Sequence, residues 1–256
     1  MKTAASDAVL GVLFLVLLLL TGCGEKPRAS MVTWETGQYP DSVCSALLEP
    51  TGSPGSQSGI VYIEYSPVEG TDDWYIARLD TERGWWGGFR VFGWDGLTIT
   101  DTASQAPGDT LEVTGQSVEE VGSLIVPGIE DPVVYVIDRT HQGNRMLYLW
   151  KLADDSYLYP LCKARITLNL DDSSYDLSWW FEDDGTGTGR LVLEGDLHEP
   201  GTAEDGAVCV IVPVRKVYTL DEGSGKYLLD YGESTGIRSW DFMDSGYADP
   251  QQEQDG

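Results

Sequence analysis

Short segments in which apolar and polar side chains alternate recur along most of this chain. Residues 164–170 show the pattern well, because Ile166 and Leu168 would face one side of a strand and Arg165 and Thr167 the other. Glycine, proline and aspartate separate such segments at intervals of about ten residues, which is typical of antiparallel β-proteins. The segments predicted as strands are residues 60–65, 74–79, 85–92, 97–100, 111–114, 133–138, 146–151, 164–170, 175–182, 191–194, 207–214, 216–220 and 227–230.

These segments predict an all-β fold, with an antiparallel sandwich or barrel-like body built from many short strands. Helical patterns do not separate the strands, which argues against a parallel α/β sheet. Residues 133–137 and 208–212 are apolar on both faces, so we expect a layered body that covers both sides of these strands. A short β-propeller is the alternative. It is suggested by recurring hairpins in which an acidic turn is followed by an aromatic residue at the start of the second strand, although their spacing is irregular.

The first residues of the chain follow a different pattern. Lys2 precedes an unbroken apolar run over residues 8–20, and small residues follow the run. A charged start, an apolar middle and a small-residue end predict a secretory signal peptide. The run is shorter than the ~20 apolar residues that a membrane-spanning helix needs.

The end of this segment reads Leu20-Thr21-Gly22-Cys23, which resembles the lipobox of bacterial lipoproteins. The resemblance covers residues 1–23 only. It implies cleavage before Cys23, a diacylglycerol on the sulfur and an acyl chain on the new amino group. Several acyl chains on one residue make attachment stable, whereas a single chain holds only marginally. The resemblance therefore implies a protein of the bacterial cell envelope, anchored to a membrane by lipid and facing the periplasm or the exterior.

The chain divides into four regions in this interpretation. Residues 1–22 are the signal peptide, and residues 23–58 hold the lipidated N-terminus, a tether and a short helix near residues 40–48. Residues 59–243 form the all-β domain, in which residues 117–121 are interpreted as one helical turn. Residues 244–256 are expected to be a disordered acidic tail.

The net charge of −26 restricts the partners of the protein. Such a charge argues against binding to nucleic acid and against direct adhesion to anionic lipid surfaces. No cofactor is predicted, and calcium is the alternative, with Asp183 and Asp184 as its ligands. Asp171 and Asp172 lie at the other end of the same predicted strand, so one shared calcium site is not expected.

Three cysteines remain once the lipid occupies Cys23. Disulfides are permitted outside the cytoplasm, and three cysteines allow one internal bridge. The sequence does not settle which pair forms, and we favour Cys44 with Cys162. Cys209 lies in a strongly apolar run and is predicted to be a buried thiol.

No catalytic residue is predicted from the motifs of this chain. Residues 232–236 match the G-x-S-x-G pattern of a nucleophile elbow, but that site needs a following helix and a later histidine. His141 and His198 both precede the motif, and the residues from Ile237 onward do not have a helical pattern. We therefore interpret the motif as a surface turn.

Two tryptophans are the best candidates for ligand binding. Trp86 would share a face of its strand with Arg90, and Trp180 would share a face with Ser178 and Glu182. A large ring on a polar face is typical of a platform for a sugar ring or a peptide. The alternatives are that another layer covers these rings, or that Arg90 stacks on Trp86.

The sequence predicts a non-enzymatic envelope lipoprotein that binds a protein, a glycan or a cell-wall component. The alternative is a secreted carbohydrate-active hydrolase that uses a pair of carboxylates. A structural or assembly role without a small ligand is the third option.

Overall fold

The regular secondary structure in the described part of the chain is almost entirely β-strand, which confirms the all-β prediction. The structure is a computed structural model that describes residues 32–35, 60–81, 87–95, 99–105, 117–139, 143–183, 185, 187–203 and 206–244. These residues all belong to the unit formed by residues 31–256. Within the described ranges the α-helix is limited to α3 (Ser239–Asp244).

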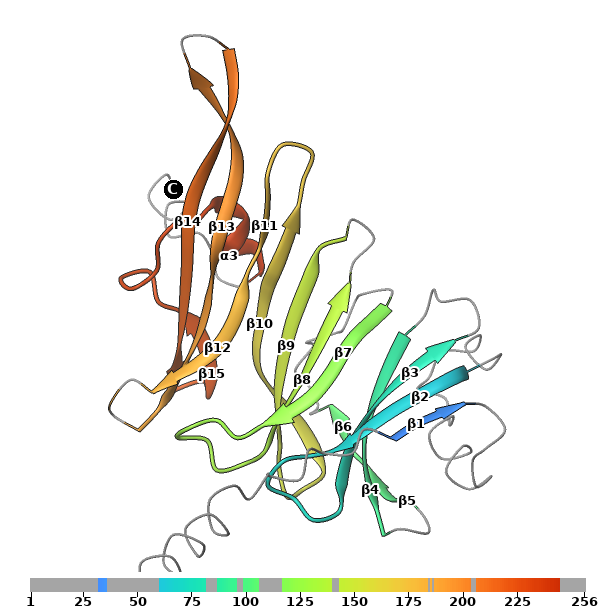
Figure 1. The fold of residues 1–256 in the computed structure, drawn as a ribbon. Helices are drawn as coiled ribbons and strands as arrows, with labels where there is room; N and C mark the ends of the chain where they lie inside the picture. Colours follow the sequence, from blue (N-terminus) through green and yellow to red (C-terminus); the bar gives the residue numbers. More distant parts are fainter. Residues whose placement is uncertain are drawn as a thin grey trace, which may run out of the picture. The chain divides into compact units, whose positions relative to one another are not determined.

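A five-stranded antiparallel sheet is built from the first part of this unit (Figure 1). Its strands lie in chain order, so each pairs with its sequence neighbours. They are β1 (Val32–Glu35), β2 (Ile60–Pro67), β3 (Trp74–Thr81), β4 (Gly87–Trp94) and β5 (Ile99–Thr102).

A ten-stranded sheet contains the remaining strands, in the order β15-β14-β13-β11-β10-β9-β8-β7, with β12 beside β13 and β6 beside β10. Only the short β6–β10 pair is parallel among these described strands. Two sheets of this size fit a sandwich-like body and not the separate blades of a propeller. The strands are β6 (Ser104–Gln105), β7 (Ser117–Leu124), β8 (Val133–Arg139), β9 (Arg145–Leu152), β10 (Tyr157–Asn169), β11 (Ser174–Asp176), β12 (Ser178–Asp183), β13 (Gly189–Ala203), β14 (Gly206–Asp221) and β15 (Lys226–Leu229).

Strand β8 separates two hydrophobic cores. Val134 and Val136 belong to the inter-sheet core, which also contains Ile76 and Val91 of the five-stranded sheet. Ile137 faces the other way, into the large-sheet core. The apolar pattern over residues 133–137 is thus covered on both sides, as predicted.

The large-sheet core lies between two parts of the same sheet. Leu147 of β9 and Ile166 of β10 share this core with Leu193 of β13, Tyr218 of β14 and Tyr227 of β15. These strands lie in different parts of the sheet, so the ten-stranded sheet must fold over itself to bury them together. The region where the two parts join is therefore a natural place for an irregular surface.

Several predicted elements differ from the observed ones. Residues 117–121 belong to strand β7 and form no helical turn, and a helix, α3, does follow Ile237. The predicted strand over residues 175–182 is divided into β11 and β12 at Leu177. The predicted helix near residues 40–48, the predicted strand over residues 111–114 and the tail after residue 244 lie outside the described residues.

The largest difference is the length of the β13–β14 ribbon. Its pairing continues from Leu191↔Tyr218 to Ala203↔Gly206, through residues such as Pro200 that lay between the predicted strands 191–194 and 207–214. In the described structure, β13 pairs with β11 only at His198, so residues beyond it have β14 as their single neighbour. Edge strands tolerate proline, because one side of the strand needs no hydrogen bond to a neighbour.

Candidate ligand-binding cleft

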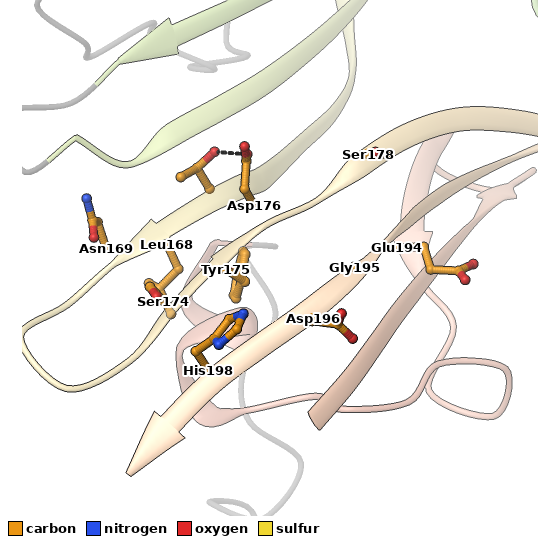
Figure 2. Close-up of a pocket in the computed structure, with 11 residues that line it drawn as sticks. Leu168, Asn169, Ser174, Tyr175, Asp176, Ser178, Glu194, Gly195, Asp196 and His198 are labelled. Carbon is orange, nitrogen blue, oxygen red and sulfur yellow. Dashed lines mark hydrogen bonds between the residues drawn. The ribbon is translucent and has the colours of Figure 1, made fainter. Parts of the chain in front are cut away.

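A cleft of about 540 Å³ opens where β10, β11, β12 and β13 meet (Figure 2). We call it the outer-face cleft. Its lining combines three carboxylates, one imidazole, four hydroxyls and one amide with a small apolar part. The lining residues are Thr167, Leu168, Asn169, Ser174, Tyr175, Asp176, Ser178, Glu194, Gly195, Asp196 and His198.

The cleft exists because the strand ladder is interrupted here. β11 pairs with β10 over three residues, whereas its ladder with β13 is limited to the pair Ser174↔His198 in the described structure. The chain then passes Leu177, whose backbone N–H still donates to the Ile166 carbonyl at 2.7 Å, and pairs with β13 again from Ser178 onward. Between these two contacts β13 has no ladder partner on this side, so the regular strand surface is interrupted.

Gly195 allows the chain to approach β13 closely at this point. A Cβ atom at Gly195 would lie 2.9 Å from the backbone oxygen of Asp176 and 3.0 Å from Cδ2 of Leu177. Real Cβ atoms are not found that close to backbone atoms, so another residue would push Asp176 and Leu177 outward. Glycine at this position therefore shapes one wall of the cleft.

The polar side chains reach the cleft because residues alternate along a strand. Glu194, Asp196 and His198 occupy every second position of β13 and share one face (Figure 2). All three are exposed, as are Asp176 and Ser178 on the opposite side. The cleft thus offers several hydrogen-bond donors and acceptors to a ligand.

Two of the three carboxylates are already held by arginines. Oδ1 of Asp176 accepts hydrogen bonds from Oγ1 of Thr167 at 2.6 Å and from Nη1 of Arg145 at 3.4 Å. Oε2 of Glu194 accepts from Nη1 of Arg215 at 2.7 Å. The Asp196 carboxylate makes no hydrogen bond or ion pair with another described residue, so it is available to a ligand.

The end of the β13–β14 ribbon lies beside the cleft. Sγ of Cys209 is 3.9 Å from Nδ1 of His198. Cys209 is exposed, so its prediction as a buried thiol is wrong. The expected cover over residues 208–212 is also absent in the described structure, where Val210 is 39% and Ile211 58% exposed. The reason is that the ribbon extends past β11 (Figure 1), so that Val208, Val210 and Ile211 are exposed, whereas Val212 still packs against the large-sheet core.

Trp180 lies on the same strand as Ser178, two residues farther from the cleft. Its ring is half-buried, and its Nε1–H donates to Oε1 of Glu182 at 3.3 Å, which confirms the face predicted for these residues. Nη2 of Arg215 also donates to Glu182, at 2.9 and 3.0 Å, and this hydrogen bond lowers the pKa of that carboxyl. Trp180 therefore stands in a polar, ion-paired surface that continues from the cleft.

The second predicted platform is only partly described. Arg90 is half-buried in β4, its Nη1–H donates to the Phe89 carbonyl at 3.1 Å, and burial lowers the pKa of the guanidinium. Trp86 lies outside the described residues, so stacking between Trp86 and Arg90 stays a prediction. Arg90 and Trp180 belong to different sheets, so they do not form one strand surface.

The predicted calcium ligands gain no support. Asp183 is exposed, and its Oδ1 accepts a hydrogen bond from the Gly185 backbone N–H at 2.8 Å, which is a turn contact. Asp184 lies outside the described residues. Among the residues that are described, no three His, Cys, Asp or Glu side chains are grouped to hold a metal ion.

The remaining predicted residues concern cysteines and the serine motif. Cys162 is a free thiol in the large-sheet core, and burial raises its pKa to about 12. Cys44 and Cys23 lie outside the described residues, so the bridge and the lipidation stay predictions. The motif at residues 232–236 forms a turn, in agreement with the interpretation from the sequence. Oγ of Ser234 accepts a hydrogen bond from the Val217 backbone N–H at 2.9 Å.

Sequence reasoning missed the cleft residues on β13. The pattern Glu194-x-Asp196-x-His198 places three polar groups on one face, but the predicted strand ended at residue 194. An alternation test continued past that point would have found them.

Comparison with known proteins adds no relative. The chain matches no protein-family model, no curated protein and no solved structure. In the part of the chain that the structure describes, the helical segment is too short and too polar to cross a lipid bilayer.

Proposed function

We propose that this chain is a lipid-anchored lipoprotein of the bacterial cell envelope, and that its β-domain binds a cell-wall glycan in the outer-face cleft without transforming it. The signal peptide and the Leu20-Thr21-Gly22-Cys23 sequence support the anchor. The observation that carries the binding proposal is the row of exposed Glu194, Asp196 and His198 along one open wall.

The chemistry of the cleft suits a ligand rich in hydroxyl groups. Carboxylates accept hydrogen bonds from sugar hydroxyls, while Ser178 and His198 can both donate and accept. Trp180 lies on the same face of β12 as Ser178 and offers an aromatic surface for a neighbouring sugar ring. A chain of sugars could therefore extend from the cleft along β12.

Isothermal titration calorimetry tests the binding site. The mature, lipidated protein in detergent is titrated with peptidoglycan glycan fragments and with unrelated oligosaccharides. Asp196→Asn should weaken binding of the recognised glycan at least about tenfold, since a hydrogen bond to a charged group contributes about 1.5–3 kcal/mol, and His198→Gln should weaken it about two- to tenfold, since a typical hydrogen bond contributes about 0.5–1.5 kcal/mol.

Asp154→Asn is the matched control for this experiment. Asp154 is an exposed acid in the turn between β9 and β10, at the opposite end of β10 from the cleft. This variant should bind as tightly as the unmodified protein. Equal affinity in all three variants, or no heat with any glycan, would contradict the proposal. Release of reducing ends during the titration would instead favour the carbohydrate-active hydrolase.

Fractionation of cells tests the anchor separately. The unmodified protein should sediment with membranes, and its N-terminal peptide should carry acyl chains on Cys23. The variant Cys23→Ser should lose both the lipid and the membrane association. A variant that still sediments with membranes would contradict lipid anchoring through this residue.

A further inference from the structure

A buried polar cluster adjoins the cleft through Tyr175, which belongs to both. Lys216 is only 1% exposed and Asp241 of α3 only 3%. Both contact Tyr175 of β11, so the cluster joins three elements that are far apart in the sequence. Full burial of an ammonium and a carboxylate is costly, because both lose their hydration.

The atoms of this cluster are arranged in close contact. Nζ of Lys216 lies 2.6 Å from Oδ1 of Asp241 and 2.8 Å from Oη of Tyr175. The Tyr175 hydroxyl donates to the same Oδ1 at 3.4 Å. Oδ2 of Asp241 accepts the backbone N–H of Arg238 at 2.9 Å. The amine is therefore held directly beside the carboxyl group, and each carboxyl oxygen has its own donor.

Beside Tyr175 and the Arg238 guanidinium, which interacts electrostatically with Asp241, the described neighbours of the pair are apolar. Val214 and Tyr218 flank Lys216 at alternate positions of β14, and both are buried in the large-sheet core. Trp240, next to Asp241 in α3, packs against the same core. Such a site excludes water, which would otherwise compete with an amine and favour hydrolysis of any acyl bond formed there.

We propose that Lys216 and Asp241 are joined by an intramolecular amide bond. A proton first passes from the ammonium to the carboxylate, which converts two buried charges into a neutral amine and a neutral carboxylic acid. The Nζ electron pair then attacks Cγ of Asp241 to form the C–N bond. The bond from Cγ to Oδ1 breaks, and Oδ1 leaves as water. One amide and one water molecule replace the amine and the acid, so no oxidant or further reactant is needed.

The neighbouring groups can assist both the proton transfers and the formation of the tetrahedral intermediate. Tyr175 contacts both the attacking nitrogen and the leaving oxygen, so its hydroxyl can take a proton from Nζ and deliver one to Oδ1. The Arg238 N–H is directed at Oδ2, where negative charge develops in the tetrahedral intermediate. Proximity supplies the remaining advantage, because the folded chain holds both reactants in place.

Mass spectrometry of a tryptic digest of the denatured full-length mature protein tests the bond. If the amide is present, trypsin does not cleave after Lys216, and residues 216–226 remain joined to residues 239–256. The joined peptide is lighter by one water molecule than the sum of its two parts. Separate peptides 217–226 and 239–256, without the joined species, would overturn the proposal.

The protein contains its own matched control. Lys151 and Asp131 form another lysine–aspartate pair at 3.3 Å, but their side chains are 37% and 33% exposed. This pair should not be linked, and trypsin should cleave after Lys151. The variant Lys216→Arg should abolish the joined peptide, and Tyr175→Phe should lower its yield several-fold. An unchanged yield in Tyr175→Phe would overturn the role of the hydroxyl, and the digest of the unmodified protein decides the bond whether or not the variants fold.

Discussion

The buried cluster makes a quantitative prediction about stability when its charges are removed. Lys216→Met leaves Asp241 buried without its cation, although the Tyr175 and Arg238 hydrogen bonds remain. Removing one partner of a buried ion pair typically destabilises a protein by about 3–5 kcal/mol. Replacing both partners with apolar residues, as in Lys216→Met with Asp241→Leu, typically restores this loss, because no unpaired charge is left.

An amide bond would add a second contribution that no apolar replacement restores. Lys216 and Asp241 are 25 residues apart, and a crosslink over that distance reduces the entropy of the unfolded chain. The loop-closure relation used for disulfides gives about 3.5 kcal/mol at 25 °C for a loop of this length. The single variant should therefore be about 6.5–8.5 kcal/mol less stable than the unmodified protein, and the double variant about 3.5 kcal/mol less stable.

Guanidinium unfolding followed by tryptophan fluorescence measures these differences. The double variant is the decisive sample, since the single variant loses a large part of the ~5–15 kcal/mol by which native proteins are stable. Linear extrapolation gives the free energy of unfolding for each protein with an uncertainty of about 10–15%. A double variant as stable as the unmodified protein would refute the crosslink as a source of stability.

Three further predictions concern the cleft, the surface charges and the thiols. Gly195→Ala should destabilise the protein by about 1–3 kcal/mol and weaken glycan binding, because the added Cβ would meet the β11–β12 connection; unchanged unfolding and affinity would contradict this account of the wall. The hydrogen bonds from Arg215 and Arg238 lower the pKa values of Glu182 and Glu199. These two pairs should therefore stabilise the protein fully at a pH above 4.5, the ordinary pKa of glutamate, and progressively less as the pH falls below it. Urea unfolding at a series of pH values measures this dependence. Arg215→Gln should reduce the slope of the unfolding free energy against pH in that acidic range. Exposed Cys209 should react with a disulfide reagent in the native protein, whereas buried Cys162 should react only after unfolding; equal rates would contradict their placement.

The strand content of the protein was predictable because it depends on local patterns. Two-sided apolar residues 133–137 indicated a strand between two layers, and Val134 and Ile137 do face different cores. The face of Trp180 was also predictable, since neighbours in a strand point to opposite sides. The same reasoning failed for residues 208–212, because an apolar pattern does not reveal where a ribbon leaves the body of the fold.

The sequence by itself determined most of the strands, the alternation of their two faces, and the expectation of a lipid-anchored envelope protein. These follow from period-two alternation and from a short contiguous segment, which need no information about distant residues. Only the tertiary structure decided the cleft, which combines residues of β10 to β13 where one ladder stops, and the contact of Lys216 with Asp241. Both depend on how the large sheet folds over itself, and that arrangement is set by packing between segments far apart in the chain.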